Sequence, residues 1–144
     1  INQVECHPYF PQTELKALLA QHNIALQAWY PLGGRGNDSI MSEPLVQGLA
    51  EKHGKSPAQI LLRWHIQQGH IVIPGSKTPS HITQNIDLFD FALTDEDMAQ
   101  IDSLDRGSRS SSTTTRSWPG SSHMCPTWRA RSSPIPRTPP SAWP

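Results

Sequence analysis

Hydrophobic and polar residues alternate along residues 1–105 with two periods, one typical of short strands and one typical of amphipathic helices. Strands are predicted where the chain alternates or runs apolar between turn residues, at 1–5, 24–29 and 71–73. Helices are predicted where apolar residues recur at helical spacing, at 12–22, 44–53, 57–68, 79–86 and from 95 onward. Since helices separate the three strands, we expect parallel strands covered by helices, within a larger sheet or barrel.

Two of these helices have clear start signals. Ser56 is the predicted N-cap of one, with Pro57 as its first residue and Gly69 as its stop. Thr94 is the predicted N-cap of the last helix, and the acids 95–97 occupy its first turn, where the helix dipole favours anions. We expect these acids to form a solvated face and not a catalytic carboxylate pair.

Composition changes sharply after residue 105. All 12 acidic residues and half of the 12 lysines and arginines precede position 106, so the zero net charge combines an acidic part with a basic one. Residues 106–144 are rich in serine, proline and arginine, and Ile135 is their only branched aliphatic residue. Such a segment buries too little apolar area to offset its ordering entropy. We therefore predict a folded part at 1–105 and a disordered tail at 106–144.

The sequence also disfavours several protein classes. No apolar run approaches the roughly 20 residues of a membrane span, and no signal region opens the chain. The strand pattern is already under way at Ile1, which suggests a truncated start. The two cysteines, Cys6 and Cys125, have no metal or redox spacing and suggest a reducing compartment. We expect a cytoplasmic protein with no membrane or nucleic-acid partner, and no metal site.

The histidines do not cluster in the sequence either. His22 and His53 fall near predicted helix ends, where a cation interacts favourably with the dipole, and His65 lies within a helix. None has a second ligand at metal spacing, so the sequence predicts structural roles for them.

Residues 73–79 carry the most informative chemistry. This Ile-Pro-Gly-Ser-Lys-Thr-Pro run leaves a predicted strand and enters a predicted helix, so backbone N–H groups, two hydroxyls and one ammonium converge there. That combination suits a phosphate, although a capped helix beside a solvated Lys77 explains the same residues. Trp29, at the end of a predicted strand, either stacks on a planar ligand or lies half-buried at a rim.

Five ordered motifs within residues 1–105 resemble the aldo-keto reductases, in particular bacterial members similar to 2,5-diketogluconate reductases. They are Asn-Gln-Val-Glu-Cys-His-Pro-Tyr at 2–9, Ala-Trp-Tyr-Pro-Leu-Gly at 28–33, Pro-Ala-Gln-Ile-Leu-Leu-Arg-Trp at 57–64, Ile-Val-Ile-Pro-Gly-Ser at 71–76 with Asn85, and Phe-x-Leu-Thr at 91–94 with Asp97 and Met98. The resemblance implies an α/β fold, the C-terminal portion of a (β/α)₈ TIM barrel. This chain would supply strands six to eight with their helices.

The resemblance implies NAD(P)H-dependent reduction of an aldehyde or ketone to an alcohol, with a small carbonyl compound as substrate. It assigns the nicotinamide end of the cofactor to two residues: Gln3 would hold the carboxamide and Trp29 would stack on the ring. It assigns the pyrophosphate to the loop of Tyr30, Leu32 and Gly34.

The adenosine end is assigned in the same way. Ser76, Lys77 and Thr78 match the loop that holds the 2′-phosphate, and Gln84 and Asn85 match the adenine contacts.

Three positions depart from the family pattern. Tyr30 stands where many members have serine, Gly75 where NADPH-specific members have lysine, and His81, in the same phosphate clamp, where they have arginine. Two fixed positive charges are therefore absent, and the sequence leaves NADPH and NADH both open as cofactor. No catalytic residue is assigned, because the family's catalytic aspartate, tyrosine, lysine and histidine all precede its sixth strand.

The resemblance ends near Arg106. Residues 111–117 read in a shifted frame suggest the family's own ending, so a frameshift is one interpretation of the tail and a genuine disordered tail the other. The alternative function is a truncated, non-enzymatic product or an interaction protein that acts through its basic, proline-rich tail, where residues 136–139 fit P-x-x-P. Because three strands leave open edges, we also expect the chain to self-associate.

Overall fold

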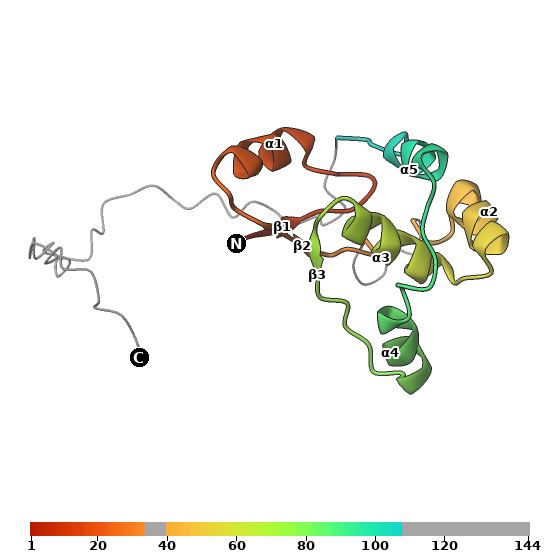
Figure 1. The fold of residues 1–144 in the computed structure, drawn as a ribbon. Helices are drawn as coiled ribbons and strands as arrows, with labels where there is room; N and C mark the ends of the chain where they lie inside the picture. Colours follow the sequence, from red (N-terminus) through yellow and green to blue (C-terminus); the bar gives the residue numbers. More distant parts are fainter. Residues whose placement is uncertain (34–39, 108–144) are drawn as a thin grey trace, which may run out of the picture. The chain divides into compact units, whose positions relative to one another are not determined.

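The computed structural model describes residues 1–33 and 40–107, and every structural statement below concerns these residues. Three strands form a parallel sheet, in the order β1 (Asn2–Glu5), β2 (Leu26–Trp29) and β3 (Ile71–Val72). Five helices follow the predicted order around it: α1 (Thr13–Gln21), α2 (Pro44–His53), α3 (Pro57–Gln67), α4 (Pro79–Ile86) and α5 (Asp95–Asp102) (Figure 1). The predicted alternation of strands and helices, and the parallel pairing, are confirmed within this part of the chain.

One face of the sheet packs against α1. Leu26 and Ala28 of β2 are buried there together with Cys6 and with Leu19 of α1. The helical spacing of Leu15, Leu18 and Leu19 predicted an apolar face on this helix. Leu19 is buried in this cluster, whereas Leu18 is 51% exposed.

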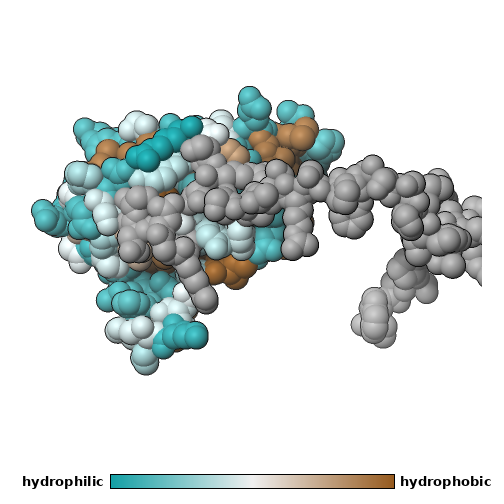
Figure 2. Space-filling view, turned by 180° about the vertical axis from the view of Figure 1, so that it is seen from behind, coloured by the Kyte–Doolittle hydropathy of each residue, from teal (hydrophilic) through white to brown (hydrophobic). Residues whose placement is uncertain are grey.

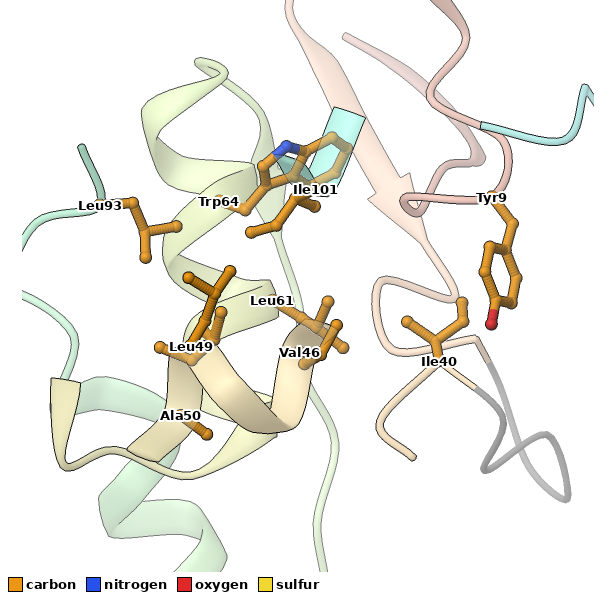
Figure 3. Packing of buried hydrophobic residues seen from close by; sticks show 10 residues of the cluster. Tyr9, Ile40, Val46, Leu49, Ala50, Leu61, Trp64, Leu93 and Ile101 are labelled. Atoms are coloured by element: carbon orange, nitrogen blue, oxygen red, sulfur yellow. The ribbon is translucent and has the colours of Figure 1, made fainter. Parts of the chain in front are cut away.

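The larger core surrounds α3. Its Leu61 and Trp64 are fully buried and meet side chains of α2 and α5, including Leu49 and Ile101 (Figure 3). Trp64 also keeps its one polar group paired, because its Nε1–H donates to Asp102 Oδ1 at 2.8 Å. Burial of this much aromatic and aliphatic surface makes α3 the helix to which α2, α4 and α5 are attached.

Both predicted helix starts are confirmed. The Ser56 side chain accepts a hydrogen bond from the Gln59 backbone N–H, and the Gln59 side chain accepts one from the Ser56 N–H at 3.0 Å. Thr94 and Asp97 form the same reciprocal arrangement at the start of α5. Each such capping box satisfies two backbone donors that a helix start otherwise leaves unpaired.

The prediction of a solvated acidic face on α5 is wrong for Asp97, which is only 1% exposed. Its carboxylate accepts hydrogen bonds from Lys52 Nζ at 2.7 Å and from His53 Nε2 at 2.9 Å, both at the end of α2. Burial raises the pKa of Asp97, but the bonds from Lys52, His53 and Thr94 outweigh burial and hold that pKa well below its usual range. Asp97 therefore joins α2 to α5.

The surface carries exposed apolar side chains among polar ones, and Figure 2 shows several separate apolar patches on one face. Two of the exposed residues, Ile71 and Ile73, follow the line of β3, which is an edge strand within the described part of the chain. Among residues 1–33 and 40–107, no helix is both long enough and apolar enough to cross a membrane.

Replacing Asp97 with Asn should lower the free energy of unfolding at pH 7 by about 2 kcal/mol or more, because buried bonds to charged partners are lost. The pKa of Asp97 is lower in the folded chain than in the unfolded chain. Its contribution is therefore complete above about pH 5 and declines as the pH falls below about 4. Urea unfolding at several pH values should show that the difference in unfolding free energy between the unaltered chain and Asp97→Asn becomes smaller as the pH falls.

Asp95→Asn is the matched control, since Asp95 is an exposed acid in the same first turn. It should cost less than about 1 kcal/mol, the usual size of a helix-dipole interaction. Equal effects of the two substitutions would contradict the role given to Asp97.

Candidate cofactor site

A cavity of about 470 Å³ lies between the start of α3, the loop after β3, α4 and the loop that precedes α2. Five residues that the family resemblance assigns to the cofactor line it: Leu32, Ser76, His81, Gln84 and Asn85. They come from three separate segments, so the fold brings together residues that are far apart in the sequence.

Polar contacts of α3 hold α4 and the residues after it in position. Gln59 Nε2 donates to the backbone carbonyl of Asp87 at 2.8 Å, directly after α4 ends. Lys55 Nζ contacts the carboxylates of Asp87 at 3.1 Å and Asp90 at 2.5 Å. Arg63 Nη1 donates to the Leu88 carbonyl at 3.0 Å. The wall that carries Gln84 and Asn85 is thus fixed by its C-terminal end, because α4 itself has no buried residue.

The loop that enters α4 is held by its own hydrogen bonds. The Thr78 backbone N–H donates to Ser76 Oγ at 3.1 Å, which satisfies one of the N–H groups expected to face a phosphate. Lys77 and Thr78 are exposed and do not line the cavity, whereas Ser76 does. The structure therefore brings part of the predicted phosphate loop to the cavity, and the roles of Lys77 and Thr78 stay predictions.

A second cavity, of about 280 Å³, continues the first one towards the end of β2. Tyr30 and Ile73 line it, and it shares Leu32, Met41 and Gly75 with the larger cavity. The two cavities are therefore neighbours, with these three residues in the lining of both.

Trp29 lies at the end of β2, 40% exposed, with its ring centroid 3.9 Å from that of Tyr30. Tyr30 has a left-handed φ of 59°, a strained conformation for an aromatic residue and one that often marks a functional loop. This backbone turn directs the chain away from the strand immediately after Trp29.

Gln3 and Trp29 lie on the same face of the sheet. Gln3 pairs in register with Gln27, and Glu5 with Trp29, so side chains of these alternate positions point to one side. That face is opposite to the one covered by α1, where Leu26 and Ala28 are buried. The third member of the predicted pyrophosphate loop, Gly34, lies outside the described residues.

The two departures from the family's phosphate clamp meet at the same cavity. Gly75 and His81 both line it, and His81 is exposed. A Cβ atom built on Gly75 would meet nothing within 4 Å, and Gly75 does not adopt the left-handed conformation. A larger side chain at this position is therefore tolerated by the surrounding atoms, so no close contact requires glycine there.

Sequence reasoning missed one cluster of reactive side chains. Cys6, His65 and His70 are all buried, and one ligand atom of each lies within 4.8 Å of the others. Their spacing in the sequence gave no metal signal, because Cys6 and the histidines belong to different βα units. Only the packing of α3 against the sheet brings them together. Of the tail that carries the alternative function, residues 108–144 lie outside the described residues.

Comparison with known proteins agrees with this architecture. The model of the aldo/keto reductase family matches residues 1–106. The chain is 53% identical over 109 residues to an aldo-keto reductase of Mycobacterium sp. (strain KMS), an alignment covering 76% of this chain and 38% of that protein. It is 43% identical over 109 residues to the methylglyoxal reductase DkgA of Escherichia coli (strain K12), covering 76% and 39% respectively.

A solved structure also aligns well. A mutant of Gox0644 in complex with NADPH superposes with a TM-score of 0.69 at 42% identity, covering 73% of this chain and 38% of that one. The chain belongs to the aldo/keto reductase family. The family resemblance inferred from the motifs is thereby confirmed, as is the predicted α/β fold class. The chain spans about 38% of the length of the curated relatives that it matches first.

Replacing Gln59 with Leu should loosen the cavity wall formed by α4. The substitution removes the donor to the Asp87 carbonyl and the acceptor of the capping box, so we expect a loss of about 1–3 kcal/mol of stability. Amide hydrogen exchange should accelerate in 79–88 more than in α1. Gln100→Leu, an exposed glutamine on α5, is the control and should leave exchange in α4 unchanged. Protection in 79–88 that survives Gln59→Leu would contradict this account.

Proposed function

We propose that this chain supplies the cofactor-binding part of an NAD(P)H-dependent aldo-keto reductase that reduces aldehydes or ketones to alcohols. The observation that carries the proposal is the convergence of Leu32, Ser76, His81, Gln84 and Asn85 on one cavity in a member of this family. The NADPH complex of Gox0644, which the chain resembles, adds support.

The adenosine end of the cofactor would occupy the larger cavity. Gln84 and Asn85 would contact adenine, and Ser76, Lys77 and Thr78 would surround the 2′-phosphate. A phosphate at this helix start would meet the positive end of the dipole of α4, which begins at Pro79.

The nicotinamide end would lie near the C-terminal end of β2, beside β1. Trp29 would stack on the ring and Gln3 would hold the carboxamide, which agrees with the shared sheet face of these two residues. The pyrophosphate would follow Tyr30, Leu32 and Gly34 between the two ends. Leu32 lines both cavities, which supports this path.

Reduced nicotinamide supplies a hydride to a carbonyl carbon. The residues of this chain would bind and orient it: Trp29 would cover one face of the ring and leave the other face open to the substrate. A carbonyl reduction also needs an acid that gives a proton to the oxygen. We assign no residue of this chain to that role.

We also infer that the chain corresponds to strands six to eight of a TIM barrel.

The remaining sequence-based inferences stay predictions. They are a cytoplasmic location, a small carbonyl substrate, self-association through open sheet edges, the absence of a nucleic-acid partner, and a disordered or frameshifted tail at 106–144.

Cofactor choice should depend on Gly75 and His81. A 2′-phosphate is bound through charge-assisted hydrogen bonds, each worth about 1.5–3 kcal/mol, and neither residue supplies a fixed positive charge. We expect the chain to bind NADPH less than roughly a hundredfold more tightly than NADH. Gly75→Lys combined with His81→Arg should raise that preference about tenfold or more, as measured by fluorescence titration with both nucleotides.

A neutral pair, Gly75→Gln with His81→Gln, controls for added bulk and should leave the preference unchanged. A thousandfold preference for NADPH in the unaltered chain would show that this account of the loop is wrong. Equal gains in the charged and neutral variants would do the same.

The purified chain should not reduce carbonyl compounds, because none of its residues is assigned as the proton donor. NADPH consumption with glyceraldehyde should equal the rate of a blank without protein. Steady turnover above that blank would contradict the assignment of roles, whereas the nucleotide titrations above test the cofactor site separately.

A further inference from the structure

Cys6, His65 and His70 form a buried cluster beside the sheet, where α3 contacts β3. Cys6 follows β1, His65 lies on α3, and His70 directly precedes β3. The Nδ1 atoms of the two histidines are 3.1 Å apart, and Cys6 Sγ lies 3.9 Å from His70 Nδ1. The exposed fractions are 0% for Cys6 and His65 and 6% for His70, so all three side chains are shielded from solvent.

We propose that this cluster binds a zinc ion through Cys6 Sγ, His65 Nδ1 and His70 Nδ1. Zinc takes thiolate and imidazole ligands at about 2.3 Å and about 2.0–2.1 Å, which in a tetrahedron separates two nitrogens by about 3.3 Å and sulfur from nitrogen by about 3.6 Å. The separations of 3.1 and 3.9 Å are close to these values. Thiolate and imidazole together select zinc over magnesium or calcium, which prefer oxygen ligands.

His65 is already oriented as a zinc ligand. Its Nε2–H donates to the Pro31 carbonyl oxygen at 3.1 Å, which leaves the lone pair of Nδ1 directed at the cluster. Histidines that bind metals usually donate their other ring N–H to a carbonyl or carboxylate in this way, and the bond fixes both tautomer and ring plane. A hydrogen bond to a fixed backbone group therefore prepares one ligand.

The cluster also has access to solvent. His70 lines a cavity of about 210 Å³ that is bordered by Lys16, Gln68 and Asp102. A water molecule in this cavity would complete a four-coordinate site. None of the three ligands lines the two cavities of the proposed cofactor site.

The protonation states of the two histidines are compatible with zinc binding. Burial lowers the pKa of His65 to about 3 and that of His70 to about 4, so both rings are neutral at pH 7. Their Nδ1 atoms, 3.1 Å apart, share one hydrogen bond that a bound zinc ion would replace. Burial raises the pKa of the Cys6 thiol to about 12 in the absence of metal. Binding therefore breaks the S–H bond heterolytically: the proton goes to solvent, the sulfur lone pair binds zinc, and nothing is oxidised or reduced.

Charged groups of both signs lie near the cluster. The charged or titratable groups near the cluster are Lys16 of α1, Asp102 of α5 and His7, which follows β1. Lys16 carries a positive charge and donates to Gln68 Oε1 at 2.5 Å, so it opposes a cation. Asp102 carries a negative charge and therefore favours a bound cation.

Cobalt titration of the metal-free, full-length chain tests the proposal. We expect one Co²⁺ per chain, with a thiolate-to-cobalt charge-transfer band and the intense visible bands of a four-coordinate site, all removed by one equivalent of Zn²⁺. One proton should be released per metal ion, from the Cys6 thiol. Cys125→Ser is the control for the other thiol and should leave the spectrum unchanged.

Three variants separate a zinc site from a buried hydrogen-bonded cluster. Cys6→Ser should abolish the charge-transfer band, and His70→Gln should weaken binding at least tenfold, with circular dichroism reporting whether each variant folds. Lys16→Gln keeps all three ligands and should tighten binding about threefold or more, since it removes an opposing charge.

The outcome is decisive even if the ligand variants fail to fold, because Lys16→Gln and proton release test the intact cluster. A wild-type chain without the charge-transfer band overturns the proposal. So does a band that survives Cys6→Ser or disappears in Cys125→Ser, and so does an affinity that is unchanged by Lys16→Gln.

Discussion

The rest of the described structure depends on the nearly complete burial of α3. Ile60, Leu61, Leu62 and Trp64 are all fully buried, so apolar contacts surround this helix on more than one side. The polar groups of its buried residues Gln59, Trp64 and His65 cannot bond to bulk water. Each polar group must find a protein partner, because an unpaired buried donor or acceptor costs about 1–3 kcal/mol.

Those obligatory partners determine the arrangement of the neighbouring elements. Gln59 satisfies its amide with the Asp87 carbonyl, which holds the chain just after α4. Trp64 satisfies its ring N–H with Asp102 at the end of α5. The candidate cofactor cavity is bounded by α4, so its shape follows from how α3 pairs its own polar groups.

Local signals in the sequence predicted the elements of this fold well. Ser56 and Thr94 marked helix starts because an N-cap acts on backbone groups only a few residues away. The strand at 24–29 proved shorter, since the pairing begins at Leu26. The cofactor residues were assigned by family motifs and not by periodicity, and the structure brings five of them to one cavity.

Features that depend on distant partners were not predictable in this way. Asp97 looks like a solvated first-turn acid until Lys52 and His53, from another helix, are brought beside it. Cys6, His65 and His70 show no spacing signal, because their proximity arises only when α3 packs on the sheet. In both cases a charge or a ligand set is created by tertiary structure, while the pattern along the chain reports only local geometry.

The turn after β2 connects the histidine cluster to the candidate cofactor site. Tyr30 has a left-handed backbone, which for a residue with a Cβ costs roughly 1–2 kcal/mol and persists only where neighbours hold it. Its carbonyl accepts from the Gly33 N–H at 2.9 Å, and the next carbonyl, that of Pro31, accepts from His65 Nε2. His65 thus helps to fix the turn that carries Tyr30 and Leu32, which both line the smaller cavity. The bond needs a hydrogen on Nε2 and a fixed ring orientation, and the burial of His65 within the core holds the ring in place.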